Sequence, residues 1–559
     1  MFIRPKKNGK YTYLQIVENT RVGAEVRQKV LLSLGRLDVL VENGRLDALL
    51  ASGLRFSKKL HVLDFYTKNN PPSTSTKKIG MPLLFERLWK ESGIQDALKK
   101  FLASRRFGID IERIVFVSVL HQLIRPGSDR HTEHWMRGYA IGGIDSIRLH
   151  HFYRAMRWLG EELGLAQQSY ATPFSPRCTK DELEEYLFAK NQDLFSDMTM
   201  MFFDTTTLYF EGEGGDTLGE NGNNKDGCPE NHQMIVGVVL DSQGNPICSE
   251  YWPGNTADVT TLVPVVRRLQ KRFGIARICI VADRGMISKE TIEKLEELKW
   301  EYILGARMRA SKEVYNEVLH DPGPFHLVHE ERIKSKDPSP LQVKEVLVGD
   351  HRYIVCLNTE QQRKDAYDRE AIVESLREKL KQGDKAFVGN KGYKRYLKGT
   401  GKHFEVDEAK LETEELFDGK WVLRTNTQLS TAEVALQYKQ LWTVEEIFRT
   451  MKSILESRPI YHQCDECIRG HVFCSFLALK LRKLLADKLA DKKYRFEWAQ
   501  MIEDIDRIEE VFVDHEEKRF IIRTEADGVA GKVFQAVGVA LPPVLRECKN
   551  LATTGNLCP

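Results

Sequence analysis

The chain has 559 residues, which is too long for a single hydrophobic core and predicts three or four domains. Hydrophobic residues make up 42% of it and charged residues 29%, as is typical of a soluble globular protein, and no apolar run is long enough to span a membrane. The ten cysteines show no disulfide spacing and no signal peptide is recognisable, so we expect a cytoplasmic protein with no membrane partner.

The net charge of +3 is small but unevenly distributed along the chain. Residues 1–60 hold twelve Lys and Arg against five Asp and Glu, and residues 381–402 hold seven basic residues against one acidic residue. Basic patches on a near-neutral protein favour contact with a polyanion such as DNA. Two solvated faces are the alternative interpretation.

The N-terminal part is predicted to be a small basic β-unit over residues 1–65. Two runs with β-like alternation, 11–17 and 26–34, support this. A polar stretch, Asn69–Lys78, is predicted to be a linker. Residues 80–195 are predicted to be a helical region for DNA binding or dimerisation, although no helix-turn-helix is recognisable. Its apolar residues recur at helical spacing in the segments 82–92, 94–104, 109–123 and 149–163.

The stretch from Met198 to Tyr209 is rich in aromatic and β-branched residues and predicts a buried strand. Asp204 lies in its middle. An ionised carboxylate that is buried without a partner is too unfavourable to keep, so we expect Asp204 to be paired, protonated or bound to a cation. A hydrogen-bonded or capping aspartate is the alternative.

The pattern of residues 196–309 predicts an α/β core. Strand-like runs at 233–240 and 245–252 flank a hairpin turn, and Asp258 is placed to cap a helix that ends at Phe273. A short strand over 277–282 then ends in Asp283, and a helix and another strand follow. Functional groups in α/β sheets gather where strands end, so we expect Asp204 and Asp283 to meet across neighbouring strands. Capping of a turn is the alternative for Asp283.

Residues 310–428 interrupt the α/β pattern and are predicted to be a mainly β insertion. Runs at 343–348 and 353–357 indicate a hairpin, 363–381 a charged helix, and 421–425 a further strand. The basic segment between the helix and the last strand offers candidate DNA contacts at Lys391, Lys394 and Arg395.

Residues 429–490 are predicted to contain the helices that complete the core. Ser430 and Glu433 form a capping box, so we expect a helix from there that ends before Pro459. Its apolar stripe consists of Leu441, Val444, Phe448, Met451 and Leu455.

Two adjacent glutamates on this helix are not equivalent. On a helical wheel Tyr438, Glu445 and Lys452 lie along one edge of the stripe, whereas Glu446 is about 100° from Glu445 on the polar side. Glu445 can therefore face the sheet. A solvated glutamate paired with a lysine is the alternative.

Together, Asp204, Asp283 and Glu445 would supply the all-oxygen ligands that suit Mg²⁺ or Mn²⁺. Such ions polarise a phosphodiester and activate the attacking oxygen, and paired sites hold them about 4 Å apart. Lys452, about two turns beyond Glu445 on the same edge, would lie near phosphates.

These features, in this order, resemble the bacterial insertion-sequence transposases of the Asp-Asp-Glu (DDE) type, in the group with a β insertion before the catalytic glutamate. The signature Tyr-x2-Arg-x3-Glu-x6-Lys of that group is matched by Tyr438, Glu445 and Lys452. Leu441 stands where the signature has arginine, and Arg449 on a nearby face is the candidate substitute. The motifs around the two aspartates also match, and the resemblance extends over residues 200–480.

The resemblance implies an α/β fold with a ribonuclease-H-like catalytic core, interrupted by a mainly β insertion and preceded by a helical DNA-binding region. It implies that Asp204, Asp283 and Glu445 bind two Mg²⁺ or Mn²⁺ ions. A homodimer in the nucleoid would bridge two transposon ends with their inverted repeats. Water would first cut the DNA, and the freed 3′-hydroxyl would then attack target DNA. The DNA-contacting side chains would be Tyr438, Lys452, Arg449, Arg284, Lys391, Lys394 and Arg395.

Two other functions stay open: a metal-dependent nuclease of the same fold, and an inactive DNA-binding protein descended from a transposase, which Leu441 keeps open. His462, Cys464, Cys467 and His471 include a zinc-like Cys-x2-Cys spacing. Their overall spacing fits no usual zinc pattern, and the apolar helix predicted over 468–485 favours packed side chains. Residues 491–559 are a candidate dimerisation region.

Overall fold

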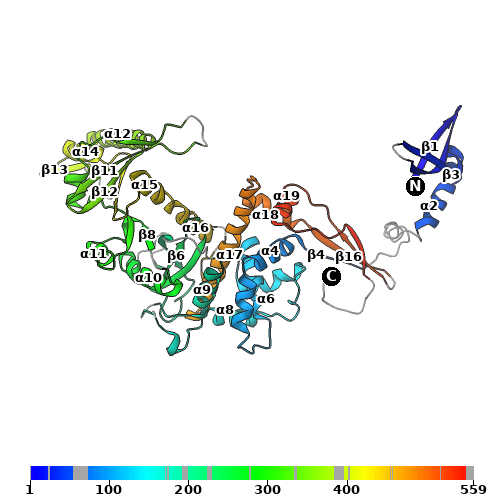
Figure 1. The fold of residues 1–559 in the computed structure, drawn as a ribbon, viewed down its shortest axis with the longest axis horizontal. Helices are drawn as coiled ribbons and strands as arrows, with labels where there is room; N and C mark the ends of the chain where they lie inside the picture. The colour runs from blue at the N-terminus through cyan, green and yellow to red at the C-terminus, as the bar shows by residue number, and fades with distance from the viewer. Residues whose placement is uncertain are drawn as a thin grey trace. The chain divides into compact units, whose positions relative to one another are not determined.

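The computed structural model describes residues 2–22, 25–54, 73–169, 171–172, 175–191, 199–222, 230–275, 278–332, 337–382, 396–400, 403–453, 455, 457–515 and 518–548. The chain divides into two compact units (Figure 1). One comprises residues 1–83, 138–143 and 496–559, and the other comprises residues 84–137 and 144–495. Among the described residues no helix is both long and apolar enough to cross a bilayer.

The first unit begins with a three-stranded antiparallel sheet in the order β1-β2-β3. The runs predicted at 11–17 and 26–34 lie in its second and third strands, so both strand predictions are confirmed. Two helices follow the sheet. The elements are β1 (Phe2–Asn8), β2 (Tyr11–Val22), β3 (Glu25–Arg36), α1 (Leu37–Glu42) and α2 (Arg45–Leu54).

A second sheet of the first unit joins distant parts of the sequence in the order β18-β17-β16-β4. Its elements are β4 (Ser73–Lys78), α18 (Trp498–Asp506), β16 (Glu509–His515), β17 (Lys518–Arg523), α19 (Ala530–Val537) and β18 (Leu545–Cys548). The linker predicted over Asn69–Lys78 is therefore wrong for residues 73–78, which pair antiparallel with β16. Edge strands are often polar, and the backbone bonds that hold this one come from a segment over 400 residues away, so the local pattern did not reveal it.

Helices fill residues 80–191, as predicted. They are α4 (Gly80–Glu91), α5 (Ile94–Leu102), α6 (Ile111–Ile124), α7 (Asp129–Trp135), α8 (Leu149–Gly160) and α9 (Thr179–Asn191). The helix α6 is rich in apolar residues and is buried on almost every side. It packs against α8 and against the long helix α17 (Asp465–Asp491).

The second unit is built on a nine-stranded mixed sheet in the order β10-β11-β12-β15-β9-β8-β5-β6-β7. Its strands are β5 (Thr199–Tyr209), β6 (Gln233–Leu240), β7 (Pro246–Pro253), β8 (Ile278–Ala282), β9 (Glu301–Gly305), β10 (His326–His329), β11 (Leu341–Val348), β12 (His351–Leu357) and β15 (Lys420–Thr425). The strands β5, β8 and β9 are parallel, and the other neighbours are antiparallel.

The strands of the predicted insertion extend this sheet, because β15 pairs with β9. The hairpin and the charged helix predicted there are present. The helix is 24 residues long and is followed by a small hairpin and another helix. These elements are α12 (Thr359–Gln382), β13 (Leu397–Thr400), β14 (His403–Val406) and α14 (Glu408–Glu415). The candidate contacts Lys391, Lys394 and Arg395 lie outside the described residues.

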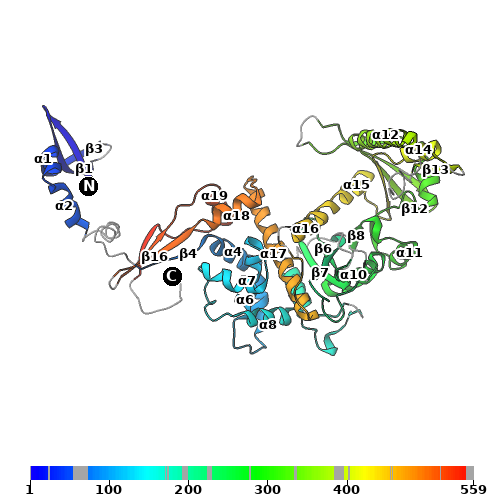
Figure 2. The same ribbon diagram turned by 180° about the vertical axis from the view of Figure 1, so that it is seen from behind.

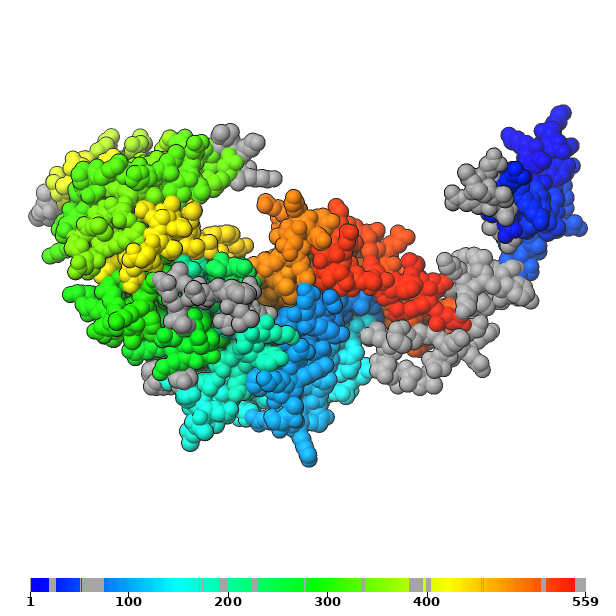
Figure 3. All heavy atoms as spheres, viewed as in Figure 1, coloured from blue at the N-terminus to red at the C-terminus, as the bar shows by residue number. Residues whose placement is uncertain are grey.

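Helices lie on both faces of the core sheet (Figure 2), and in the space-filling view the yellow residues of α15 lie against the green residues of the core (Figure 3). On one face α10 (Asp258–Phe273) and α11 (Lys289–Glu297) form a buried core with strand side chains that include Phe203 and Ala282. Two further helices, α15 (Thr431–Lys439) and α16 (Leu441–Ser453), pack on the sheet, with α16 against β5 and β6.

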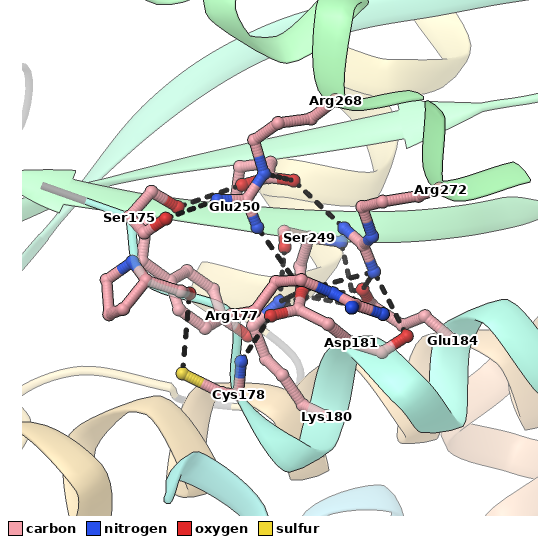
Figure 4. A network of polar contacts seen from close by, with 12 residues as sticks. Ser175, Arg177, Cys178, Lys180, Asp181, Glu184, Ser249, Glu250, Arg268 and Arg272 are labelled. Atoms are coloured by element: carbon pink, nitrogen blue, oxygen red, sulfur yellow. Dashed lines mark hydrogen bonds and ion pairs between the residues drawn. The ribbon is translucent and has the colours of Figure 1, made fainter. Parts of the chain in front are cut away.

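A buried network of charges joins α9 to the sheet and to α10 (Figure 4). Arg272 lies 2.8 Å from Glu184 of α9 and 3.0 Å from Glu250 of β7, and Lys180 lies 3.0 Å from Asp181. Burial alone would raise the pKa of Asp181, but the surrounding cations lower it below its usual value. Since breaking a buried ion pair leaves an uncompensated charge, this network fixes α9 against β7.

Candidate active site

The two aspartates are brought together by strand register. The parallel pairing of β5 with β8 ends with Phe203 opposite Ala282, so Asp204 and Asp283 come next on adjacent strands. Phe203 and Ala282 both point into the core under α10 and α11. Because side chains alternate along extended chain, and Asp283 is still extended, both carboxylates point to the opposite face. The expectation that they lie on neighbouring strands is confirmed.

Asp204 is half-buried and accepts a hydrogen bond from the next residue of its own strand. The amide of Thr205 donates to Asp204 Oδ1 at 2.7 Å, and the hydroxyl of Thr205 donates to Asp258 Oδ1 at 2.9 Å. The prediction that Asp258 caps α10 is wrong, since the N-cap is Ala257 and Asp258 is the first helical residue. Its carboxylate instead ties the start of α10 to the strand beside Asp204.

Asp283 is exposed and accepts a hydrogen bond of 3.0 Å from the hydroxyl of Tyr438 on α15. Burial, and then the neighbouring Asp283, raise the pKa of Tyr438 well above its usual value, so the phenol keeps its proton. The hydroxyl lies directly over Gly305, the last residue of β9. A Cβ at Gly305 would lie only 2.4 Å from it, so this close approach requires glycine.

The helix that carries Glu445 does not run unbroken from the capping box. The capping box of Ser430 and Glu433 is confirmed, but the chain forms two helices that are separated at Gln440. There the amide of Gln440 donates to the carbonyl of Gln437, and the amide of Thr443 to that of Gln440, which are bonds of the tighter three-residue type. The prediction of one continuous helix is wrong at this point.

The predicted apolar stripe on α16 is buried, and Leu441 belongs to it, with 8% of its surface exposed. The leucine that replaces the arginine of the signature therefore packs in the core. Glu445, Glu446 and Arg449 are exposed, and Lys452 is half-buried.

Glu446 faces α17. Burial lowers the pKa of Arg482 on that helix, and the nearby Glu446 carboxylate partly offsets this effect. Both glutamates are exposed, so the expectation that Glu445 faces the sheet and Glu446 the polar side stays a prediction.

A family model described as a transposase DDE domain matches residues 196–481, just over half of the 559 residues. The chain belongs to the DDE transposases. A second model, the N-terminal domain of the IS1634 family transposases, matches residues 3–64.

The likeness of this transposase to solved structures is weak. Among solved structures it resembles one described as the crystal structure of the Mos1 mariner paired end complex with Mn, with 14% identity and a TM-score of 0.14. The alignment covers 34% of the transposase and 57% of that chain. No curated protein sequence matches the transposase.

The donors at the transposase site are of the right type for a hard divalent cation. Asp204 and Asp283 supply two neighbouring carboxylates, and Glu445 is the candidate third. They do not form a closed ligand set as they stand: across the described part of the chain no three His, Cys, Asp or Glu side chains gather closely enough to hold a metal ion. Asp283 is engaged by Tyr438, and Glu445 projects from a separate helix.

The cysteines and histidines near the start of α17 form no metal site among the described residues either. His462 Nε2 lies 3.5 Å from Asp129 Oδ2, and the ring of His471 is centred 5.2 Å from that of His462. Burial, and then its neighbour Cys464, raise the pKa of the Cys467 thiol, which disfavours the thiolate that zinc requires. Cys474 is fully buried, as expected of a packed side chain.

Proposed function

We propose that this transposase cuts DNA at the ends of an insertion sequence and joins the freed 3′-hydroxyl to target DNA. The observation that carries the proposal is the aspartate pair. Asp204 and Asp283 stand in register on adjacent parallel strands, on the face that also receives Tyr438 of α15. A pair of carboxylates held by a rigid sheet is suited to phosphoryl transfer, because that chemistry depends on positioning and on charge stabilisation.

The arrangement of the core supports a ribonuclease-H-like fold. Three antiparallel strands, β5 to β7, are followed by the parallel strands β8 and β9, with helices on both faces of the sheet. The insertion that precedes α15 then extends the same sheet.

The proposed roles follow from where each side chain lies. Asp204, Asp283 and Glu445 would hold two Mg²⁺ or Mn²⁺ ions, which polarise the phosphodiester and activate the attacking oxygen. Arg284, Arg449 and Lys452 would contact DNA phosphates; the first two are exposed and Lys452 is half-buried. Tyr438 fixes the orientation of Asp283 through its hydroxyl. A homodimer that bridges two inverted repeats remains the proposed assembly.

The test uses DNA that carries the ends of the element. Asp204→Asn and Asp283→Asn should each abolish cleavage in Mg²⁺ and leave end binding largely intact, because affinity for DNA comes mainly from Lys and Arg contacts to phosphate. Asp350→Asn, in the exposed turn between β11 and β12, is the matched control for loss of one carboxylate.

Cleavage by either active-site variant within about tenfold of wild type, a change of only about 1.4 kcal/mol in the barrier, would refute the assignment. The assay also scores joining to a target plasmid. Cleavage without joined products would instead favour the nuclease, and end binding without cleavage by the wild type would favour the inactive DNA-binding protein.

A further inference from the structure

The N-terminal sheet carries most of the charge of its region. Residues 2–36, which form the three strands, contain eight Lys and Arg against two Asp and Glu, whereas residues 37–54, which contain both helices, have one against three. The sheet is therefore the part of this region that complements a polyanion.

A hydrogen-bonded cluster of side chains joins all three strands, with Gln28 of β3 opposite Asn19 of β2. Arg4 of β1 stands opposite Gln15 of β2, and its guanidinium donates to Gln15 Oε1 at 3.0 Å and to Gln28 Oε1 of β3 at 2.6 Å. These bonds hold the guanidinium in place. Arg4 and Gln15 are half-buried and Gln28 is exposed, so the cluster is accessible from solvent.

Further side chains lie on the same face of the sheet as this cluster. Lys6 stands opposite Tyr13, Tyr13 stands opposite Arg36, and the guanidinium of Arg36 lies 3.7 Å from the centre of the Tyr11 ring. Directly opposed residues in antiparallel strands share a face, as do alternate residues along one strand, so these side chains lie on the face that carries Arg4. We call it the Arg4 face.

Acidic side chains of the strands lie away from the Arg4 face, although Asp38 of α1 forms an ion pair of 2.6 Å with Arg36 at its edge. Glu18 stands opposite Lys29 in the alternate row, so it points to the other side of the sheet. Among the strand residues whose side chains are described, the Arg4 face contains no carboxylate.

We propose that the Arg4 face enters the major groove of the transposon end and reads base edges through Arg4, Gln15 and Gln28. Strands about 4.8 Å apart give three strands a width of about 10 Å between their axes, which suits a groove about 12 Å wide. Arginine recognises guanine O6 and N7 in a bidentate manner, and glutamine recognises adenine N6 and N7. This inference rests on the proposed function, because it supplies the selection of the ends that are cut.

The experiment measures binding by the full chain in EDTA, where no cleavage occurs. Fluorescence anisotropy compares a duplex of the terminal inverted repeat with a scrambled duplex of the same composition, over a range of salt. Arg4→Lys keeps the charge but loses the planar fork. It should lower the ratio of end to scrambled affinity by about tenfold, within the range of one bidentate base contact, and leave the salt dependence unchanged.

Two controls locate the contact. Lys7→Ala removes a charge from the alternate row beside Lys6 and should leave the affinity ratio unchanged. Replacing guanine with 7-deazaguanine in the end duplex removes a major-groove acceptor. This should reduce the ratio of end to scrambled affinity for the wild type, but it should not reduce the ratio for Arg4→Lys any further.

The results separate this inference from the proposed function. If the wild type selects the end duplex but Arg4→Lys and Gln28→Ala keep the full ratio, the Arg4 face does not read bases. If the wild type binds both duplexes equally, recognition of the ends by this chain is refuted, and the proposed function fails with it.

Discussion

Tyr438→Phe tests whether the hydroxyl on Asp283 prepares the site for cations. The substitution removes a hydrogen bond of 3.0 Å to a carboxylate and leaves the ring in place. Hydrogen bonds to charged groups contribute about 1.5–3 kcal/mol. At about 1.4 kcal/mol per factor of ten, losing the bond should weaken cation binding by about ten- to a hundredfold, the usual cost of removing a group that orients a metal ligand.

Two measurements separate this role from contact with DNA. Mn²⁺ binding is followed by electron paramagnetic resonance of the free ion, and affinity for end DNA is measured in EDTA. Tyr438→Phe should weaken Mn²⁺ binding. It should leave the affinity for end DNA within about twofold of wild type, a change of only about 0.4 kcal/mol. Tyr461→Phe, at a tyrosine that is 60% exposed, is the matched control.

Gly305→Ala provides an independent check, because the added Cβ would displace the Tyr438 hydroxyl. It should reproduce the loss of Mn²⁺ affinity. Unchanged Mn²⁺ binding with weakened DNA binding in Tyr438→Phe would show that the tyrosine acts only on DNA.

The next predictions concern stability. Arg272→Leu leaves the buried carboxylates of the α9 network without their main cation and should lower the free energy of unfolding by about 3–5 kcal/mol. Arg105→Leu, in an exposed pair with Glu161, should lower it by less than about 1 kcal/mol. Calorimetric melting of the two variants checks the difference. Burial strongly lowers the pKa of three buried histidines below 6.5, and lowers that of the more exposed His151 as well. The unfolded chain therefore binds protons that the folded chain does not, and Tm should fall as the pH drops from about 6.5 towards 4. Burial raises the pKa of Asp129 to about 7, which opposes this trend, so Asp129→Asn should make the fall in Tm steeper. The three buried histidines are His462, with a pKa of about 4, and His121 and His471, each with a pKa of about 3.

Local patterns predicted most of the elements of the fold. Strands such as β5 and β8 are runs of apolar and β-branched residues, and α16 has an apolar stripe of helical period, so each is determined by its own residues. The linker prediction failed at β4 because its strand character comes from pairing with β16. The break at Gln440 was missed because nothing in the capping or apolar pattern interrupts the helix there.

In the candidate site, too, the sequence indicates individual residues but not the contacts between distant segments. Asp204 and Asp283 could be singled out because a carboxylate at the end or middle of a buried strand is unusual. The hydroxyl contacts that hold them could not be predicted. Thr205 reaches Asp258 from 53 residues away and Tyr438 reaches Asp283 from 155 residues away, and these bonds depend on how α10 and α15 pack on the sheet.

The three candidate carboxylates are positioned in different ways, and this gives the last prediction. Backbone pairing of β5 with β8 fixes the two aspartates, whereas Glu445 stands exposed on α16 beyond the break at Gln440. The aspartate pair should therefore bind a first cation without the glutamate. We expect Glu445→Gln to retain Mn²⁺ binding at reduced affinity but to lose both nicking and strand transfer. Asp204→Asn should lose Mn²⁺ binding as well as both reactions.

Glu446→Gln is the matched control for Glu445→Gln, since it removes an equal charge one residue away. Its carboxylate faces Arg482 of α17, so its loss should change stability by no more than about 1 kcal/mol and leave single-turnover cleavage near wild type. A helical side chain cannot cross a quarter-turn to exchange places with its neighbour. An inactive Glu446 variant beside an active Glu445 variant would therefore mean that α16 presents the other edge to the aspartates, and that the match to the Tyr-Arg-Glu-Lys signature does not identify the catalytic glutamate.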